Sequence, residues 1–168
     1  KADPDRVTTV NVGRQAFWPA DVGQNKAVTL VQRAHLAMGL DWRAKPRAFQ
    51  PRREERTRYD LIVTAVDRAR TRAEIGRRAY RSSLDHDPPI LWLDTGNSAH
   101  EAQIILGDWR TARSATWIPN VFPLYPERAD LDDQAQRAPS CSAAESLARQ
   151  WLPINRIVAD VAQNLLWM

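Results

Sequence analysis

The sequence has few of the residues that build metal and disulfide sites. Its single cysteine, Cys141, excludes an internal disulfide framework and a cysteine-rich zinc site. Its three histidines, His35, His86 and His100, share no metal-ligand spacing. No apolar run reaches the roughly 18 residues that a membrane-spanning helix needs, and the opening KADPDRV lacks the apolar stretch of a signal peptide. We therefore expect a cytoplasmic protein without zinc and without a membrane partner.

The composition is that of one soluble globular domain covering residues 1–168, with 43% apolar and 26% charged residues. The net charge is +4, and seven Lys or Arg residues lie between Arg43 and Arg58. This basic stretch is either a solvated loop or helix face, or a surface that binds nucleic acid. No zinc-finger or RNP pattern accompanies it, so we do not expect a nucleic-acid partner.

The apolar pattern alternates between helical and strand-like segments. Apolar residues at steps of three and four predict a helix over residues 20–40, which Gly39 would end. The run YDLIVTAV, residues 59–66, predicts a strand buried on both faces, as in a parallel sheet. A helix over 67–81, strands over 90–94 and 102–106, and a turn at 95–97 follow. This order predicts an α/β fold with a Rossmann-like sheet flanked by helices.

The last third of the chain is dominated by a long segment rich in proline. Residues 107–140 contain four prolines and an acidic patch, which predicts a crossing loop or a lid. Residues 142–168 predict two C-terminal helices, 142–151 and 154–167, separated by Pro153.

Polar and charged residues are spaced along the first 26 positions in an order that suits nucleotide chemistry. A carboxylate after a strand can hydrogen-bond the ribose hydroxyls. Arginine and lysine on a loop and an early helical turn can converge on a phosphate chain. Each residue alone is an ordinary surface or turn residue, and the ordered set carries the prediction. Its members are Asp3, Asp5, Asn11, Arg14, Gln15 and Lys26.

The segment DPDRVTTVNVGRQAFWPADVGQNKA resembles the ThiF/MoeB/HesA family and the ubiquitin-activating enzymes. Their pattern is D-x-D-x-V-x-x-x-N-x-x-R-Q followed by D-x-G-x-x-K. The resemblance implies that Asp3 holds the ribose of ATP, that Asn11, Arg14 and Lys26 contact its phosphates, and that Asp5 and Gln15 belong to the same site. Gly13 departs from the family, which often has Gln there.

Asp67 follows the predicted strand 59–66 and has two interpretations. It is either a helix N-cap or a ligand of Mg²⁺ at the carboxyl edge of the sheet. The sequence Asp67-Arg68-x-x-x-Arg72 is similar to the family pattern T-D-N-x-x-x-R, in which the Asp serves magnesium and ATP and the Arg is structural. Arg68 replaces the usual Asn of that pattern.

Two further segments resemble a subgroup of ThiF proteins found in PRTRC systems. ILWLDTGNSAHEAQIILGD matches it except for Ala102, where the subgroup has Gly, and it indicates family and core strands rather than chemistry. PSCSAAESLARQWLPIN contains Cys141, which is similar in placement to the thioester cysteine of ubiquitin-activating enzymes. Cys141 therefore has a catalytic role as a thioester or persulfide, or it is a structural apolar residue.

The phosphate loop of the family, G-x-G-G-x-G, is not found among the six glycines, because they are widely spaced. We therefore expect this loop to lie upstream, with the strand-helix-strand that carries it, and the chain to be the C-terminal portion of the domain. The paired C-x-x-C motifs that bind zinc in many members are also missing.

The resemblance implies an adenylating enzyme that uses ATP and Mg²⁺ to activate the C-terminus of a ubiquitin-like or sulfur-carrier protein, and that forms a homodimer. Its catalytic residues would be Arg14, Lys26, Asp67 and Cys141. Two alternatives stay open: a non-catalytic partner that docks a carrier or a second subunit, and a basic accessory protein that binds nucleic acid.

Overall fold

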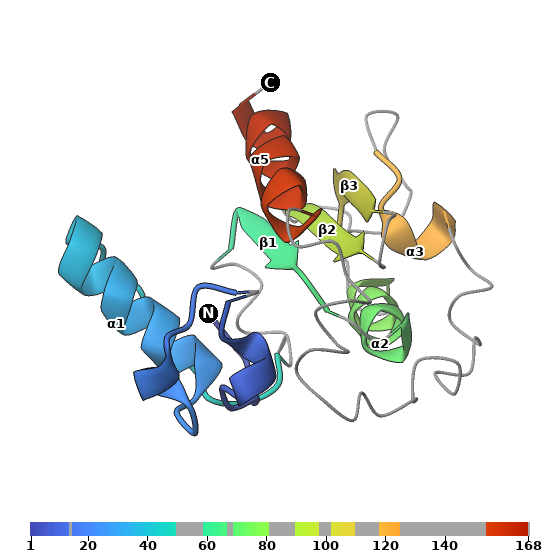
Figure 1. Ribbon diagram of the computed structural model, residues 1–168. Coiled ribbons are helices and arrows are strands. Elements are labelled where there is room, and N and C mark those ends of the chain that lie inside the picture. The colour runs from blue at the N-terminus through green and yellow to red at the C-terminus, as the bar shows by residue number, and fades with distance from the viewer. Residues whose placement is uncertain are drawn as a thin grey trace. The chain divides into compact units, whose positions relative to one another are not determined.

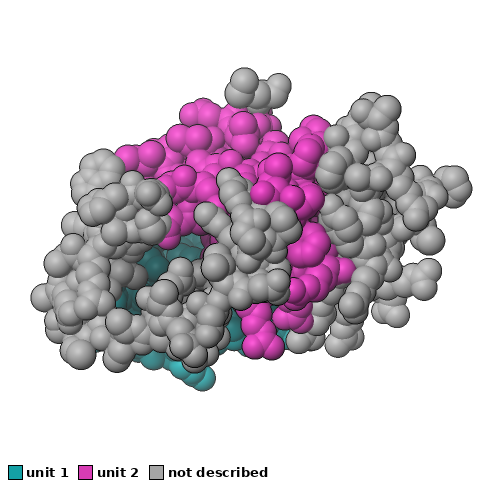
Figure 2. Space-filling model, turned by 90° about the vertical axis from the view of Figure 1, so that its right-hand side faces the viewer, with its two compact units in different colours: residues 1–50, 140–149 teal, residues 51–139, 150–168 magenta. Residues whose placement is uncertain are grey.

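The computed structural model describes most of the chain as two compact units (Figure 2). Unit 1 is formed by residues 1–50 and 140–149, and unit 2 by residues 51–139 and 150–168. No helix among the described residues is both long and apolar enough to cross a membrane. The described residues are 1–13, 15–49, 59–66, 69–80, 90–97, 102–109, 118–124 and 154–167.

The described part of unit 1 contains an extended N-terminal segment and the helix α1 (Lys26–Met38) (Figure 1). Two short 3-10 helices, Thr9–Asn11 and Pro19–Asp21, precede it. Asn25 caps α1 by accepting a hydrogen bond from Val28 N at 3.1 Å. Gly39 ends it in the left-handed conformation, with a φ of 66°, that glycine adopts without strain. The core of this unit contains Val7, Phe17, Ala27, Val31 and Ala34.

Unit 2 is built on a sheet with the strand order β1-β2-β3. Strand β1 (Leu61–Thr64) pairs parallel with β2 (Leu91–Asn97), and β2 pairs antiparallel with β3 (Ala102–Asp108). The register places Thr64 beside Asp94, and Leu91 beside Asp108. Among the described strands β2 is the central one, and its Trp92, Leu93 and Asp94 are almost completely buried.

Helices lie on both faces of this sheet, which makes unit 2 a layered α/β structure. Figure 1 shows α2 (Ala69–Tyr80) on one side of the strands and α5 (Ile154–Trp167) on the other. The buried face of α5 repeats every four residues, at Ile154, Val158 and Ala162. The short helix α3 (Val121–Leu124) packs on α2, where the ring of Phe122 lies directly against Gly76.

The α/β class and the order of elements agree with the sequence predictions, and the predicted helix 154–167 has the bounds of α5. The helix expected over 20–40 begins later, at Lys26, because a 3-10 turn and the Asn25 cap precede it. Residues 142–151, predicted to be helical, lie outside the described residues.

Three predictions about the sheet and its connections were wrong. Residues 95–97 were expected to form a turn, but they continue β2, because all three pair with β3. Strand β1 was expected to be buried on both faces, yet Val63 is 56% exposed while Ile62 and Thr64 are buried. A loop was expected over 107–140, and this was wrong for Gly107 and Asp108, which belong to β3, and for residues 121–124, which form α3. Residues 110–117 and 125–140 lie outside the described residues, so the expectation stays a prediction there.

Candidate functional site

Three of the predicted nucleotide-binding residues, Asp3, Asp5 and Lys26, lie where the N-terminal segment meets the first turn of α1. Lys26 Nζ lies 3.3 Å from Asp5 Oδ2 and forms an ion pair with it. The backbone supports this pair, because Lys26 N donates a hydrogen bond to Asp5 O at 2.9 Å. The Asp5 side chain is 65% exposed and that of Lys26 is 17% exposed. A carboxylate and an ammonium group therefore stand side by side at a helix N-terminus.

Asn25 ties this segment to the helix. Its Nδ2 donates hydrogen bonds to Asp3 O at 2.9 Å and to Asp5 O at 3.1 Å, while its Oδ1 caps α1. Asp3 Oδ1 accepts a hydrogen bond from Asp5 N at 2.9 Å. One amide side chain thus fixes Asp3, Asp5 and Lys26 relative to one another. Asn25 was not among the predicted site residues, although an Asn directly before a helix is the ordinary N-cap signal.

Asn11 and Gln15 lie on the turn that follows. Asn11 is buried, and its Oδ1 accepts hydrogen bonds from Thr8 N at 2.9 Å and Thr8 Oγ1 at 3.0 Å. Gln15 N donates to Asn11 O at 3.0 Å, and the Gln15 side chain is exposed. Gly13, with a φ of 84°, makes the tight turn between them, a conformation that the Gln often found in the family would adopt only with strain. Asn11 therefore shapes this turn in the described structure.

A clamp formed by Asp21, Arg33 and Trp18 holds the next part of the loop. Arg33 binds the Asp21 carboxylate and the Ala16 carbonyl oxygen with its guanidinium group, which also lies 3.9 Å from the centre of the Trp18 ring. Asp21 Oδ2 accepts a hydrogen bond from Trp18 N at 2.6 Å. This backbone hydrogen bond, together with Arg33, lowers the pKa of Asp21 below its ordinary value.

The other predicted site residues cannot be placed in the same way. Arg14, Asp67 and Cys141 lie outside the described residues. Within the described ranges no group of three or more His, Cys, Asp or Glu side chains could hold a metal ion. Mg²⁺ commonly takes only one or two carboxylates and completes its shell with phosphates and water, so a magnesium–nucleotide complex does not require such a group.

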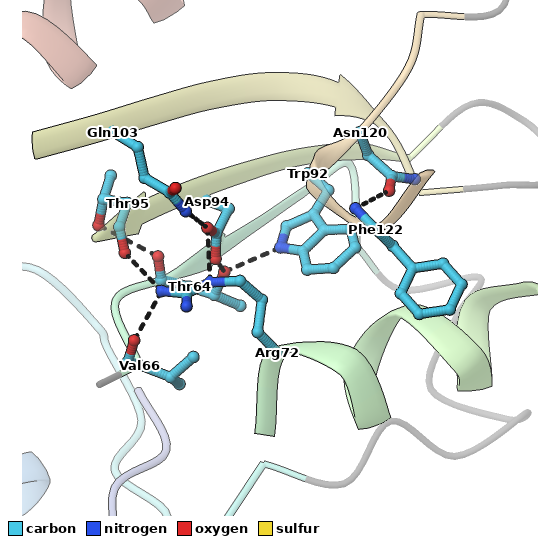
Figure 3. Close-up of polar contacts among 9 residues, drawn as sticks. All are labelled: Thr64, Val66, Arg72, Trp92, Asp94, Thr95, Gln103, Asn120 and Phe122. Atoms are coloured by element: carbon cyan, nitrogen blue, oxygen red, sulfur yellow. Dashed lines mark hydrogen bonds and ion pairs between the residues drawn. The ribbon is translucent and has the colours of Figure 1, made fainter. Parts of the chain in front are cut away.

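Unit 2 contains a buried polar network, on segments whose sequence predicted core strands and no chemistry (Figure 3). Asp94 is completely buried, and its Oδ2 lies 2.7 Å from Arg72 Nε in an ion pair. Arg72 Nε makes no hydrogen bond, so this contact is electrostatic. Asp94 Oδ1 accepts a hydrogen bond from Thr64 Oγ1 at 2.5 Å, and Oδ2 accepts one from Gln103 Nε2 at 3.2 Å.

The network extends from Asp94 to the neighbouring strands. Thr64 Oγ1 accepts a hydrogen bond from Trp92 Nε1 at 2.9 Å, and Thr64 O accepts one from Thr95 Oγ1 at 3.1 Å. Buried polar groups that are satisfied in this way fix one arrangement of the strands. The contacts join residues about 30 positions apart, and no local sequence signal indicates them.

A comparison with protein families decides the affiliation of the chain. The sequence model of the ThiF family matches residues 2–160, which include both the N-terminal site and the buried network. The chain belongs to the ThiF family. No individual curated protein matches it significantly.

ThiF-family proteins generally adenylate ubiquitin-like or sulfur-carrier proteins and use ATP with Mg²⁺. The described residues fit such a nucleotide chemically. Asp3 Oδ2 has no hydrogen bond among the described residues and can accept one from a ribose hydroxyl. Lys26 Nζ has three donors, of which Asp5 takes one, so two remain for phosphate oxygens.

Proposed function

We propose that this ThiF-family chain activates the C-terminal carboxylate of a ubiquitin-like or sulfur-carrier protein with ATP. The carboxylate oxygen attacks the α-phosphorus of ATP, and the bond to the β-phosphate oxygen breaks. Pyrophosphate leaves with that electron pair, and the carrier becomes an acyl-adenylate. The observation that carries the proposal is the family match over residues 2–160, together with the fixed group of Asp3, Asp5 and Lys26 inside it.

The residues of unit 1 would bind and orient the nucleotide. Asp3 would accept hydrogen bonds from the ribose hydroxyls, which fixes the sugar and the α-phosphate attached to it. Lys26 and Arg14 would neutralise the charge that grows on the phosphate oxygens as pyrophosphate leaves. The group is preorganised because Asn25 already holds Asp3 and Asp5 against the start of α1. Asn11 and Gln15 would support the turn that carries Arg14.

Two roles depend on residues outside the described ranges. Asp67 would ligate the Mg²⁺ of the magnesium–ATP complex, because in the sequence it stands three residues after Thr64, the carboxyl end of β1. Cys141 would receive the activated acyl group if a thioester follows adenylation, with AMP as the leaving group. Adenylation itself does not require this cysteine, so the two steps are separable.

The direct test is exchange of labelled pyrophosphate into ATP by the complete protein. A candidate ubiquitin-like carrier encoded beside it would be present, and a carrier lacking its C-terminal residues would be the control. We expect exchange that depends on the intact carrier. We also expect Arg14→Ala to lower exchange at least about tenfold, since one lost transition-state contact typically costs on the order of 3 kcal/mol. Carrier-independent ATP binding without exchange would instead support the docking-partner role.

A further inference from the structure

One arginine connects the parallel strands β1 and β2 just beyond the last residue of β1 and two residues before the last residue of β2. Arg72 Nη2 donates hydrogen bonds to Val66 O at 2.7 Å and to Thr95 O at 3.3 Å. Val66 lies two residues beyond β1, and Thr95 directly follows Asp94 in β2. Figure 3 shows the Arg72 guanidinium reaching from α2 to both places. The distance between the two strand ends is therefore set by this side chain as well as by the strand ladder.

The arginine is itself held in one orientation by a buried anion. Asp94 Oδ2 lies 2.7 Å from Arg72 Nε, and Thr64 and Gln103 hold the Asp94 carboxylate from β1 and β3. A Cβ atom at Gly96 would lie 3.0 Å from Arg72 Nη2, so the glycine leaves room for the guanidinium. Strands β1, β2 and β3 thus each contribute a residue that directly or indirectly fixes the orientation of Arg72.

Stability alone does not account for an ion pair whose carboxylate is completely buried and whose guanidinium side chain is only 12% exposed. Removing two charges from water is costly, and well-packed apolar residues of similar volume often stabilise a core equally well. The geometry of the ion pair suggests a second reason for its presence, which is the position of Arg72 between the strands. In open α/β sheets ligands bind outside the carboxyl ends of the parallel strands, and Arg72 connects β1 and β2 in their carboxyl-terminal parts.

We propose that Arg72 and Asp94 are positioning residues that hold the carboxyl ends of β1 and β2 in the spacing required for binding magnesium–ATP. This inference rests on the proposed adenylating function and deepens it. Neither side chain contacts the nucleotide; both act through the backbone at Val66 and Thr95. A displacement of about 1 Å at such a site can lower the rate of a reaction on the order of a hundredfold.

The decisive variant replaces both partners at once, Arg72→Met with Asp94→Leu. The double variant leaves no unpaired buried charge, and it is therefore expected to fold. It still lacks the hydrogen bonds to Val66 O and Thr95 O. Arg72→Lys is the conservative companion: lysine keeps the charge opposite Asp94 but lacks the planar fork that reaches both carbonyl groups. We expect the lysine variant to retain part of the function that the double variant loses.

Two measurements on the complete protein separate a positioning role from a merely structural one. Amide hydrogen exchange without ATP should become faster at Val66 and residues 95–97 in the double variant, and stay unchanged at Leu91 and Asp108. Calorimetric titration with magnesium–ATP should show at least about a tenfold weaker Kd. In pyrophosphate exchange, the KM for ATP should rise by a similar factor, and Arg72→Lys should restore part of the loss.

Asn120→Ala is the control variant. Asn120 is completely buried, donates to Asp108 O at 2.6 Å and accepts from Phe122 N at 2.9 Å. Asp108 pairs with Leu91 at the amino end of β2, so this variant should lower the unfolding temperature and leave the Kd for magnesium–ATP unchanged.

Unchanged hydrogen exchange at the strand ends would overturn the positioning role, whatever the result with ATP. Faster exchange there with a Kd within about twofold of the wild type would overturn it as well, because the hydrogen bonds of Arg72 would then have no effect on the binding of the nucleotide. A wild-type protein that binds no magnesium–ATP would overturn the proposed function and this inference together. Hydrogen exchange would still report whether Arg72 holds the backbone at Val66 and Thr95.

Discussion

Lys26 Nζ lies 3.3 Å from Asp5 Oδ2, across the junction between the N-terminal segment and helix α1. The stem of Lys26 is largely covered, because only 17% of its side chain is exposed, whereas Asp5 is 65% exposed. The ammonium group is therefore held at a fixed place while its partner faces solvent. An ion pair with one solvent-exposed partner stabilises a fold by about 1 kcal/mol at most. The ion pair matters for function because it orients the Lys26 ammonium group.

Lys26→Ala should separate function from stability. We expect pyrophosphate exchange to fall on the order of a hundredfold, because a charge that stabilises the transferring phosphate is lost. The free energy of unfolding should fall by about 1 kcal/mol or less. The measurements are carrier-dependent exchange and urea unfolding of the same preparation.

The control for Lys26 is Arg47→Ala, which removes an exposed positive charge from the same unit. Exchange should remain near the wild-type rate in this variant. Equal losses in the two variants would mean that net charge, and not the position of Lys26, governs the interaction with ATP.

Asn25 has two tasks that substitutions can divide. Asn25→Ala removes both the cap of α1 and the tether to the carbonyl groups of Asp3 and Asp5, so it should cost about 1 to 2 kcal/mol of stability. Asn25→Asp keeps a capping oxygen for Val28 N but has no amide donors for the tether. We expect Asn25→Asp to retain the helix, seen by circular dichroism, and to bind magnesium–ATP more weakly than the wild type. Equal binding by the two proteins would show that the tether does not shape the site.

The sequence was sufficient for elements whose signals are local. Helix α5 has the predicted bounds because Pro153 stands just before it and apolar residues recur every three or four positions. The end of α1 was predictable from Gly39. Residues 95–97 were mistaken for a turn, since Thr-Gly-Asn is typical of turns, but pairing with β3 overrides that preference.

Long-range relationships could not be predicted from one sequence. Arg72 and Asp94 are 22 positions apart, and Asp21 and Arg33 meet only because the loop folds back on α1. Each looks like an ordinary charged residue in its own segment. The same holds for Asp94 within WLD, which a strand pattern places in the core without indicating a partner for its charge.

The lowered pKa of Asp21 predicts a dependence of stability on pH. In the folded protein the Trp18 N–H and Arg33 favour the ionised carboxylate, so its pKa lies below the ordinary 3.8. The stabilisation is complete above pH 3.8 and is lost as the pH falls through the lower pKa of the folded state. Urea unfolding across this range should show the free energy of unfolding falling as the pH is lowered. It should fall less in Asp21→Asn than in the wild type, because the variant lacks the carboxylate that titrates. Identical slopes in the two proteins would contradict the prediction.

Gly107 should tolerate no side chain, for a steric reason. A Cβ atom there would lie 2.4 Å from Pro119 O and 2.6 Å from Asn120 Cα, both backbone atoms that cannot rotate away. Gly107→Ala must therefore push β3 away from residues 119–120 and strain the hydrogen bond from Asp108 N to Ile118 O. We expect the free energy of unfolding to fall by about 3 kcal/mol, the upper part of the range for overpacking.

Gly39→Ala is the comparison that isolates this steric effect. No atom lies within 4 Å of a Cβ built at Gly39, so its cost comes only from the left-handed conformation and should be about 1 kcal/mol. Urea unfolding of both variants gives the two values. If Gly107→Ala costs no more than Gly39→Ala, the close approach of β3 to residues 119–120 is not a constraint on the folded protein. If it costs more, the contact between these backbones fixes the amino end of β2, where Leu91 pairs with Asp108.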